Sequence, residues 1–260
     1  PMAEGVLPVL IGRAAKAAEY LAAEDKGYTA EIQLGITTDT EDTSGNILTK
    51  CDTLPDKTSF FEACTHFVGD IKQIPPMYSA LKVNGKKLCD LAREGIEIER
   101  EARSIHISEI IPEEVDEKAG IYRMHVKCSK GTYIRTLCAD IGAALGVGGI
   151  MSALTRTECS GFTLSDAHTL SEFEAMSESE REAVIFPTEH IFKSVRKIRL
   201  PAFFARLARS GLEIYLKKIG DCAEVGELIA LYDESGAFFA VGEVREFEDG
   251  IAVKPIRQLS

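Results

Sequence analysis

The sequence has no apolar run long enough to cross a membrane. A membrane-spanning helix needs roughly 20 apolar residues, and the longest apolar run here, residues 6–11, has the length of a strand. The sequence also lacks a basic segment followed by an apolar stretch, which is the pattern of a secretory leader. We therefore expect a cytoplasmic protein with no membrane partner.

Cysteine and histidine are present but never grouped. The seven cysteines form no C-x-x-C pair and are odd in number, which argues against a disulfide framework and against a zinc site. The five histidines are equally isolated, and a lone histidine is usually structural. We expect no bound metal ion.

Basic residues are fewer than acidic ones over the chain as a whole. The net charge is −11, which taken alone weighs against a nucleic-acid partner because phosphate contacts need lysine and arginine. Binding depends on local patches, however. From residue 70 to residue 94 the basic side chains outnumber the acidic ones, and the basic ones are Lys72, Lys82, Lys86, Lys87 and Arg93.

The first part of the chain mixes strand and helix patterns. Alternation of apolar and polar residues at 28–34 predicts a half-buried strand, and further strands are expected at 6–11, 105–111 and 121–128, the last two around a Glu-rich loop. Apolar residues at helical spacing predict a helix at 134–145. Other helices are expected at 13–23, 58–68, 86–93 and 170–184.

The character of the sequence changes after about residue 192. Short strand-like runs separated by turns follow at 197–200, 228–232, 238–244 and 251–256, which predicts a small β-rich domain. Strands with helices segregated among them give an α+β fold class. We therefore predict a large domain over residues 1–192 and a small one over residues 193–260.

Five motif-bearing segments occur in order along the chain. They read GVLPVLIG at 5–12, TTDTEDTSG at 37–45, QIPPMYSALKVNGKKL at 73–88, CSKGTYIRTL at 128–137, and LTRT with SGF at 154–162. In order and spacing these segments resemble the TruB family, the tRNA pseudouridine-55 synthases, across essentially the whole chain. Such long composite motifs are far more specific than a single short signature.

The resemblance implies a fold, a reaction and a partner. The implied fold is a mixed, mainly antiparallel sheet flanked by helices, followed by a small PUA-like β domain that contacts RNA. The implied reaction isomerises the T-loop uridine of tRNA to pseudouridine, with no cofactor because no redox step or group donor is involved. The implied partner is the T-arm of tRNA, bound by a monomer that requires no protein partner.

The resemblance also bears on the catalytic aspartate. The family's nucleophilic motif ends in Leu-Asp-Pro, whereas this sequence opens Pro1-Met-Ala-Glu-Gly5. The resemblance therefore places the aspartate immediately before Pro1, so the start reads as a cut. We expect the 260 residues alone to be inactive.

Two residues match the family's other catalytic positions. Tyr28 would stack on the flipped uracil and assist proton transfer at carbon 5; the alternative is an ordinary core tyrosine. Arg135 would hold the catalytic aspartate ionised; the alternative is a surface arginine. In this chain Arg135 is expected to have lost that partner. Asp39 is the one internal candidate for a replacement nucleophile, although a loop carboxylate bonded to nearby backbone is the favoured interpretation.

Candidate RNA contacts follow from the same motifs. The resemblance implies that the insertion around residues 72–93 grips the T-arm, whereas the alternative is a solvated helix face. Tyr133 resembles a pocket residue but fits a core position equally well, and Lys217, Lys218 and Lys254 are candidate contacts in the small domain. The full set of candidate RNA-binding residues in the large domain is Lys72, Lys82, Lys86, Lys87, Arg93, Lys130, Tyr133 and Arg156.

Two other functions remain open from the sequence. One is a non-catalytic tRNA-binding protein or RNA chaperone on the same fold, which the missing aspartate would permit. The other is the guide-RNA-dependent relative of the family. The acidic net charge and the short C-terminal region argue against this alternative.

Overall fold

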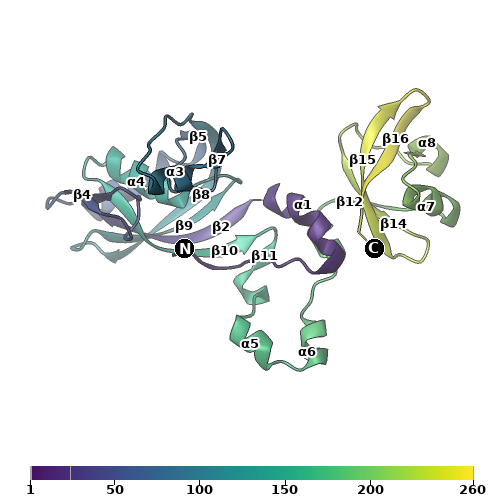
Figure 1. Cartoon of the computed structure of the whole chain (residues 1–260), viewed down its shortest axis with the longest axis horizontal. Coiled ribbons are helices and arrows are strands. Elements are labelled where there is room, and N and C mark those ends of the chain that lie inside the picture. The colour runs from purple at the N-terminus through teal and green to yellow at the C-terminus, as the bar shows by residue number, and fades with distance from the viewer. Residues whose placement is uncertain (1, 24, 260) are drawn as a thin grey trace. The chain divides into compact units, whose positions relative to one another are not determined.

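The computed structural model describes residues 2–23 and 25–259 (Figure 1). The chain divides into two compact units, one formed by Pro1–Pro8 with Ala23–Ala167 and the other by Val9–Ala22 with His168–Ser260. None of the helices in the described residues is both long and apolar enough to cross a membrane. The boundary predicted between residues 192 and 193 falls within the sequence of the second unit and stays a prediction.

The first unit is built on one sheet with the strand order β1-β10-β2-β9-β8-β5, and β11 pairs with the end of β10. Among the described strands of this sheet, β1 and β10 pair in parallel and the other neighbours are antiparallel. The strands are β1 (Glu4–Gly5), β10 (Gly149–Cys159), β2 (Lys26–Leu34), β9 (Ile121–Cys128), β8 (Arg103–Asp116), β5 (Gly69–Gln73) and β11 (Phe162–Thr163). The predicted mixed, mainly antiparallel sheet is confirmed.

One face of this sheet carries the core. Alternate residues of β2, such as Ala30 and Ile32, and of β9 are fully buried beneath helices α2 (Lys57–Thr65) and α4 (Ile134–Ala144). The period-2 pattern of a strand directs the intervening residues to the other face, where Arg123 of β9 pairs with Glu31 of β2 at 2.8 Å. The sheet is therefore apolar on the helix side and charged on the opposite side.

Short elements surround the insertion that the sequence singled out. A tight hairpin joins β6 (Lys82–Val83) to β7 (Lys86–Lys87), with positive φ at both Asn84 and Gly85. Asn-Gly is the sequence preferred for this two-residue turn. Helix α3 (Leu88–Arg93) follows directly, and a second hairpin pairs β3 (Ile36–Thr38) with β4 (Ile47–Lys50).

The second unit contains a five-stranded sheet with the order β12-β14-β15-β16-β13. Its core lies between the sheet and helices α7 (Ala202–Arg209) and α8 (Leu216–Ile219). The strands are β12 (Arg196–Arg199), β14 (Leu228–Tyr232), β15 (Phe238–Phe247), β16 (Gly250–Gln258) and β13 (Ile214–Tyr215). The remaining helices are η1 (Gly12–Ala17), α1 (Ala18–Ala23), α5 (Leu170–Ala175), α6 (Glu178–Ala183) and η3 (Thr188–Phe192), while η2 (Leu164–Asp166) belongs to the first unit.

Two predicted boundaries were wrong for local reasons. Residues 6–11 are not a strand: pairing ends at Gly5 apart from one Val6 bond, and Pro8 lacks the N–H that a ladder needs. The predicted helix at 170–184 is two helices, because Thr169 with Glu172 and Ser177 with Glu180 each form a capping box that starts a new helix.

Three other predicted elements were placed only in part. The helix at 13–23 is a 3₁₀ segment followed by α1, and the helix at 86–93 begins as strand β7. The expected Glu-rich loop after residue 109 is largely strand, since β8 continues to Asp116. Cross-strand pairs such as Lys127 with Glu109 compensate its negative charge.

Gly142 lies where α4 packs closely against the sheet. An added Cβ at this buried position would lie 2.2 Å from the Gly149 nitrogen at the start of β10. We expect Gly142→Ala to lower the free energy of unfolding by about 2 kcal/mol in urea titrations, because the clash outweighs the better helix propensity of alanine. Ala143→Gly, at the exposed neighbouring position, measures the propensity effect alone. A stabilising Gly142→Ala would contradict the close approach.

Candidate active site

A buried carboxylate lies at the centre of the loop between β3 and β4. The Asp42 side chain is only 8% exposed. Its Oδ1 atom accepts hydrogen bonds from the Thr40 hydroxyl at 2.7 Å, from the Ser44 backbone N–H at 3.0 Å and from the Ser44 hydroxyl. Burial alone would raise the pKa of Asp42, but the bonds from Ser44, Thr40 and Arg135 outweigh it and hold that pKa below its ordinary value. Asp42 is therefore ionised at neutral pH.

Arg135, in the first turn of α4, is the cationic partner of Asp42. Its Nη1 atom lies 2.9 Å from Asp42 Oδ2 and also donates to the Thr40 carbonyl at 3.3 Å. Its Nη2 atom donates to the Tyr78 carbonyl at 2.6 Å. The expectation that Arg135 has lost the catalytic aspartate stays a prediction. The sequence did not indicate Asp42 as a partner, because the fold, and no local pattern, brings this loop to the helix.

The insertion is joined to the start of α4 by a second set of bonds. Gln73 is 2% exposed; its side chain accepts from the Tyr133 N–H at 2.8 Å and donates to the Tyr133 carbonyl at 3.0 Å. Tyr133 is the N-cap residue of α4, so Gln73 satisfies its N–H, one of the donors that a helix start leaves open. The Tyr133 carbonyl also accepts the Leu137 N–H at 3.0 Å. The side chain of Tyr133 is partly exposed, and its RNA contact stays a prediction.

Tyr28 lies in β2 on the core side of the sheet, opposite Arg156 of β10. Burial is the largest cause that raises the pKa of Tyr28, and the charge of Arg156 opposes it. The phenol is therefore neutral at physiological pH and available as a hydrogen-bond donor.

The segment that begins the chain contacts the loop that carries Asp42 and also contacts Arg156, opposite Tyr28. Met2 packs on the core, and its sulfur accepts from Thr43, next to Asp42. Arg156 Nε donates to the Val6 carbonyl at 2.6 Å, and β1 pairs with β10 as far as Gly5. At Gly5, with φ of 102°, an added Cβ would lie 2.2 Å from the Arg156 oxygen. Arg156 therefore anchors this segment, and its predicted RNA contact is untested.

The predicted basic residues are exposed. Lys72, Lys82, Lys86, Lys87 and Lys130 are solvent-exposed and have no ion pair among the described residues. Arg93 contacts Asp90 at 3.4 Å, with both side chains mostly in water. Their positive charges are therefore available to a phosphate backbone.

In the second unit, the three lysines predicted to bind RNA each contact another residue of the protein. Lys254 pairs with Glu213 at 3.0 Å, and Lys217 donates to the Asp249 carbonyl at 2.9 Å. Lys218 lies over the ring of Tyr215. Among the described residues, a carboxylate pairs with Lys254 and with neither of the other two lysines, so the three are not equivalent candidates.

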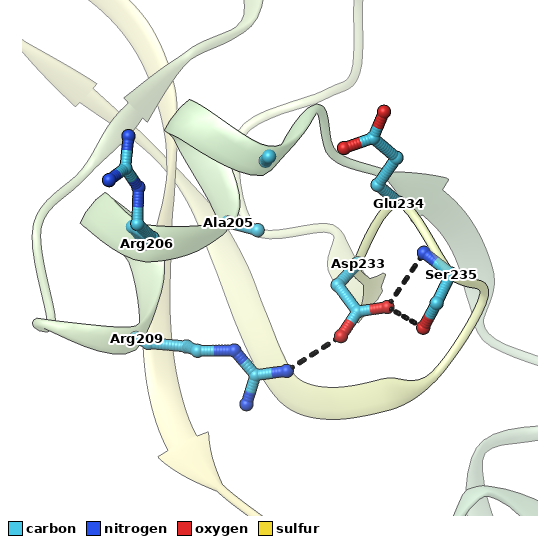
Figure 2. A pocket seen from close by; sticks show the side chains of 7 residues that line it. Ala205, Arg206, Arg209, Asp233, Glu234 and Ser235 are labelled. Carbon is cyan, nitrogen blue, oxygen red and sulfur yellow. Dashed lines mark hydrogen bonds and ion pairs between the residues drawn. The ribbon is translucent and has the colours of Figure 1, made fainter.

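An open pocket lies between α7 and the β14–β15 turn (Figure 2). Arg209 reaches across it to Asp233 at 2.8 Å, and Asp233 in turn accepts from the Ser235 N–H and hydroxyl (Figure 2). The same pocket is lined by Arg206 and Glu234. Its charges are mixed, so the pocket shows no strong preference for an anion.

The sequence singled out Asp39 instead of Asp42. Asp39 accepts from the backbone and side-chain nitrogens of Asn46 at 2.8 and 3.0 Å, which is the loop role favoured from the sequence. Asp42 is flanked two residues away on each side by Thr40 and Ser44, and these hydroxyls were the available signal for a buried carboxylate. In the described residues, no group of three or more His, Cys, Asp or Glu side chains is arranged to hold a metal ion.

Comparison with known sequences gives a consistent family. The model described as TruB family pseudouridylate synthase (N terminal domain) matches residues 1–134, and the tRNA pseudouridylate synthase B C-terminal domain matches residues 135–193. The tRNA pseudouridine synthase B of Alkaliphilus oremlandii is 41% identical over 247 residues, covering 94% of this chain and 81% of that protein. That of Methylobacillus flagellatus is 39% identical over 243 residues, covering 94% and 78%.

Comparison with solved structures gives the same fold. A chain in a Cbf5-Nop10-Gar1 complex superposes with a TM-score of 0.71 at 22% identity, covering 99% of this chain and 73% of that one. A chain in an H/ACA RNP bound to a substrate RNA containing 2′-deoxyuridine gives 0.72 at 20% identity, covering 100% and 74%. The expected α+β pseudouridine synthase fold with a small C-terminal β domain is confirmed.

Asp140, in α4, gives the structure a measurable pH dependence. Burial and then the charge of Glu41 raise the pKa of Asp140 from 3.8 to about 6. The folded state thus holds this proton more tightly than the unfolded chain, so stability is lost as pH rises from about 4 through 6. We expect Asp140→Asn to raise the free energy of unfolding by roughly 1 kcal/mol at pH 7.5, after discounting for solvent screening.

The gain from Asp140→Asn should vanish near pH 4, as measured by urea unfolding across the pH range. Asp52→Asn, at an exposed position, controls for the loss of one carboxylate charge. An equal gain at both pH values would contradict the linkage.

Proposed function

This chain belongs to the TruB family of pseudouridylate synthases, and we propose that it isomerises uridine 55 in the T-loop of tRNA to pseudouridine. The observation that carries the proposal is the ion pair between the buried Asp42 and the partly buried Arg135, beside the segment that follows Pro1. Sequence relatives at about 40% identity are tRNA pseudouridine synthases B. This supports tRNA as the substrate over a guide-RNA-dependent role.

The reaction exchanges one bond to the ribose for another. The bond from C1′ to N1 of uracil breaks, the base turns, and a bond from C1′ to C5 forms, while the proton on C5 leaves and N1 takes one up. The atoms balance within the nucleotide and water, so no cofactor is needed. The target base lies inside a folded loop and must be extruded into the site.

The family resemblance assigns the first step to an aspartate directly before Pro1, outside these 260 residues. Arg135 is suited to hold that aspartate ionised. A guanidinium has five N–H donors; the described residues engage Nη1 twice and Nη2 once. Nε and one Nη2 hydrogen remain for a second carboxylate. Asp42 fixes the guanidinium and is itself too fully bonded to act as the nucleophile.

Tyr28 and the basic insertion complete the proposed site. The neutral phenol of Tyr28 offers a flat surface for the flipped uracil and a hydroxyl for proton transfer at C5. The exposed lysines of the β6–β7 hairpin bind T-arm phosphates. The protein acts as a monomer and needs no protein partner.

Release of tritium from tRNA labelled at C5 of uridine tests the proposal, because the C5 hydrogen leaves only when the new bond forms. The chain extended upstream by the residues its gene encodes before Pro1 should release tritium, and replacement of the T-loop uridine should abolish release. The 260 residues alone should bind tRNA without releasing tritium. Tight binding with no release from the extended chain would instead establish a non-catalytic RNA-binding protein.

Tyr28→Phe separates chemistry from packing. The ring remains, so tRNA binding should change less than about threefold, while loss of the hydroxyl should slow single-turnover release at least about a hundredfold. The comparison is between the dissociation constant from filter binding and the single-turnover rate. Equal losses in both would indicate that Tyr28 only packs the core.

Replacing Lys86 and Lys87 by alanine tests the phosphate patch. We expect weaker tRNA binding and a slope of log affinity against log salt that is smaller by about 1 to 2. Lys118→Ala, at an exposed position beside Glu117, is the matched control. A slope unchanged from the unsubstituted protein would move the RNA contact elsewhere.

A further inference from the structure

Glu41 adopts an unusual backbone conformation next to the Asp42–Arg135 ion pair. Its φ is 62°, in the left-handed region that residues with a Cβ rarely adopt. It stands between Thr40 and Asp42, and both of these neighbours are bound by Arg135 Nη1, through the Thr40 carbonyl and the Asp42 carboxylate. The conformation of Glu41 therefore decides whether both acceptors face the guanidinium.

Three hydrogen bonds hold Glu41 in this conformation. The Thr136 hydroxyl donates to Glu41 Oε2 at 2.6 Å, the Met151 N–H donates to the Glu41 carbonyl at 3.0 Å, and the Glu41 N–H donates to the Thr38 carbonyl at 3.3 Å. The first of these bonds uses the side chain of Glu41, and the other two use its backbone. Glycine, which has no side chain to form the first bond, would adopt this φ without strain.

Thr136 is the residue directly after Arg135 in α4, and it is 4% exposed. Two consecutive residues in the first turn of α4 bind two consecutive residues of the loop: Thr136 binds Glu41, and Arg135 binds Asp42. Burial raises the pKa of Glu41, whereas the Thr136 bond and the charges of Arg135 and Arg100 oppose the rise. Glu41 is therefore held at this position by its bond to Thr136, although burial disfavours its charge.

We propose that Glu41 and Thr136 are positioning residues for the isomerisation: their hydrogen bond locks the left-handed turn at 40–42 and so aims the Arg135 guanidinium at the reacting site. The inference rests on the proposed function. Neither residue touches the substrate; both act through Arg135.

Glu41→Gly gives the sharpest test, because it removes the side chain and also relieves the backbone strain. In the protein with its native upstream residues, we expect thermal stability to stay level or rise, tRNA affinity to change less than about twofold, and single-turnover tritium release to slow by about tenfold or more, the loss of one charge-assisted bond. A merely structural role would move stability and rate together.

Conservative variants test the hydrogen bond itself. Glu41→Gln keeps an acceptor and Thr136→Ser keeps the donor, so both should stay within about threefold of the unsubstituted rate. Thr136→Val should slow release by about tenfold, and adding it to Glu41→Gly should cost little more, because both remove the same bond.

The outcomes are distinguishable. A Glu41→Gly protein that turns over at the unsubstituted rate overturns the positioning role, as does one that loses stability and affinity together with rate. Equal losses for Glu41→Gln and Glu41→Gly overturn the hydrogen-bond account. If the unsubstituted protein releases no tritium at all, the proposed function fails and the positioning role falls with it.

Discussion

The ion pair between Asp42 and Arg135 is the contact on which the arrangement of the first unit's site depends. Burying two charges is costly unless their remaining hydrogen-bonding capacity is met. Here Asp42 accepts additional bonds from Thr40 and Ser44, and Arg135 donates to the Thr40 and Tyr78 carbonyls. Because Tyr78 lies in the basic insertion, one guanidinium joins three segments that are far apart in the sequence. The requirement to satisfy every buried polar atom makes the geometry of this junction specific.

The sheet supplies the rigid frame for that junction. Helix α4 carries Arg135 and is seated on β10 so closely that Gly142 faces Gly149 with no room for a Cβ. The register of β2 with β10 places Tyr28 opposite Arg156, which in turn binds the segment after Pro1. Arg135 and Tyr28 therefore extend from regular elements whose positions are set by apolar packing, which holds them more accurately than a flexible loop would.

The distribution of charge resolves the conflict between an acidic chain and an RNA partner. Part of the acid is paired within the fold, as in the contacts of Arg123 with Glu31 and Glu113 on the polar face of the sheet. The lysines of the β6–β7 hairpin are exposed and unpaired among the described residues. Net charge governs solubility and long-range attraction, whereas phosphate binding depends on such local excess.

The family and the fold class could both be predicted from the sequence alone. Periodicity located β2, β9 and α4, because alternation and helical spacing are local signals, and the composite motifs pointed to Tyr28 and Arg135. The capping boxes that divide residues 170–184 into two helices are local signals of the same kind. Only the tertiary structure decided that Asp42 and not Asp39 is the buried carboxylate, and that Glu41 meets Thr136. Those pairings join residues more than 90 positions apart. They arise because the sheet brings a loop and a helix together, which no local pattern in the sequence encodes.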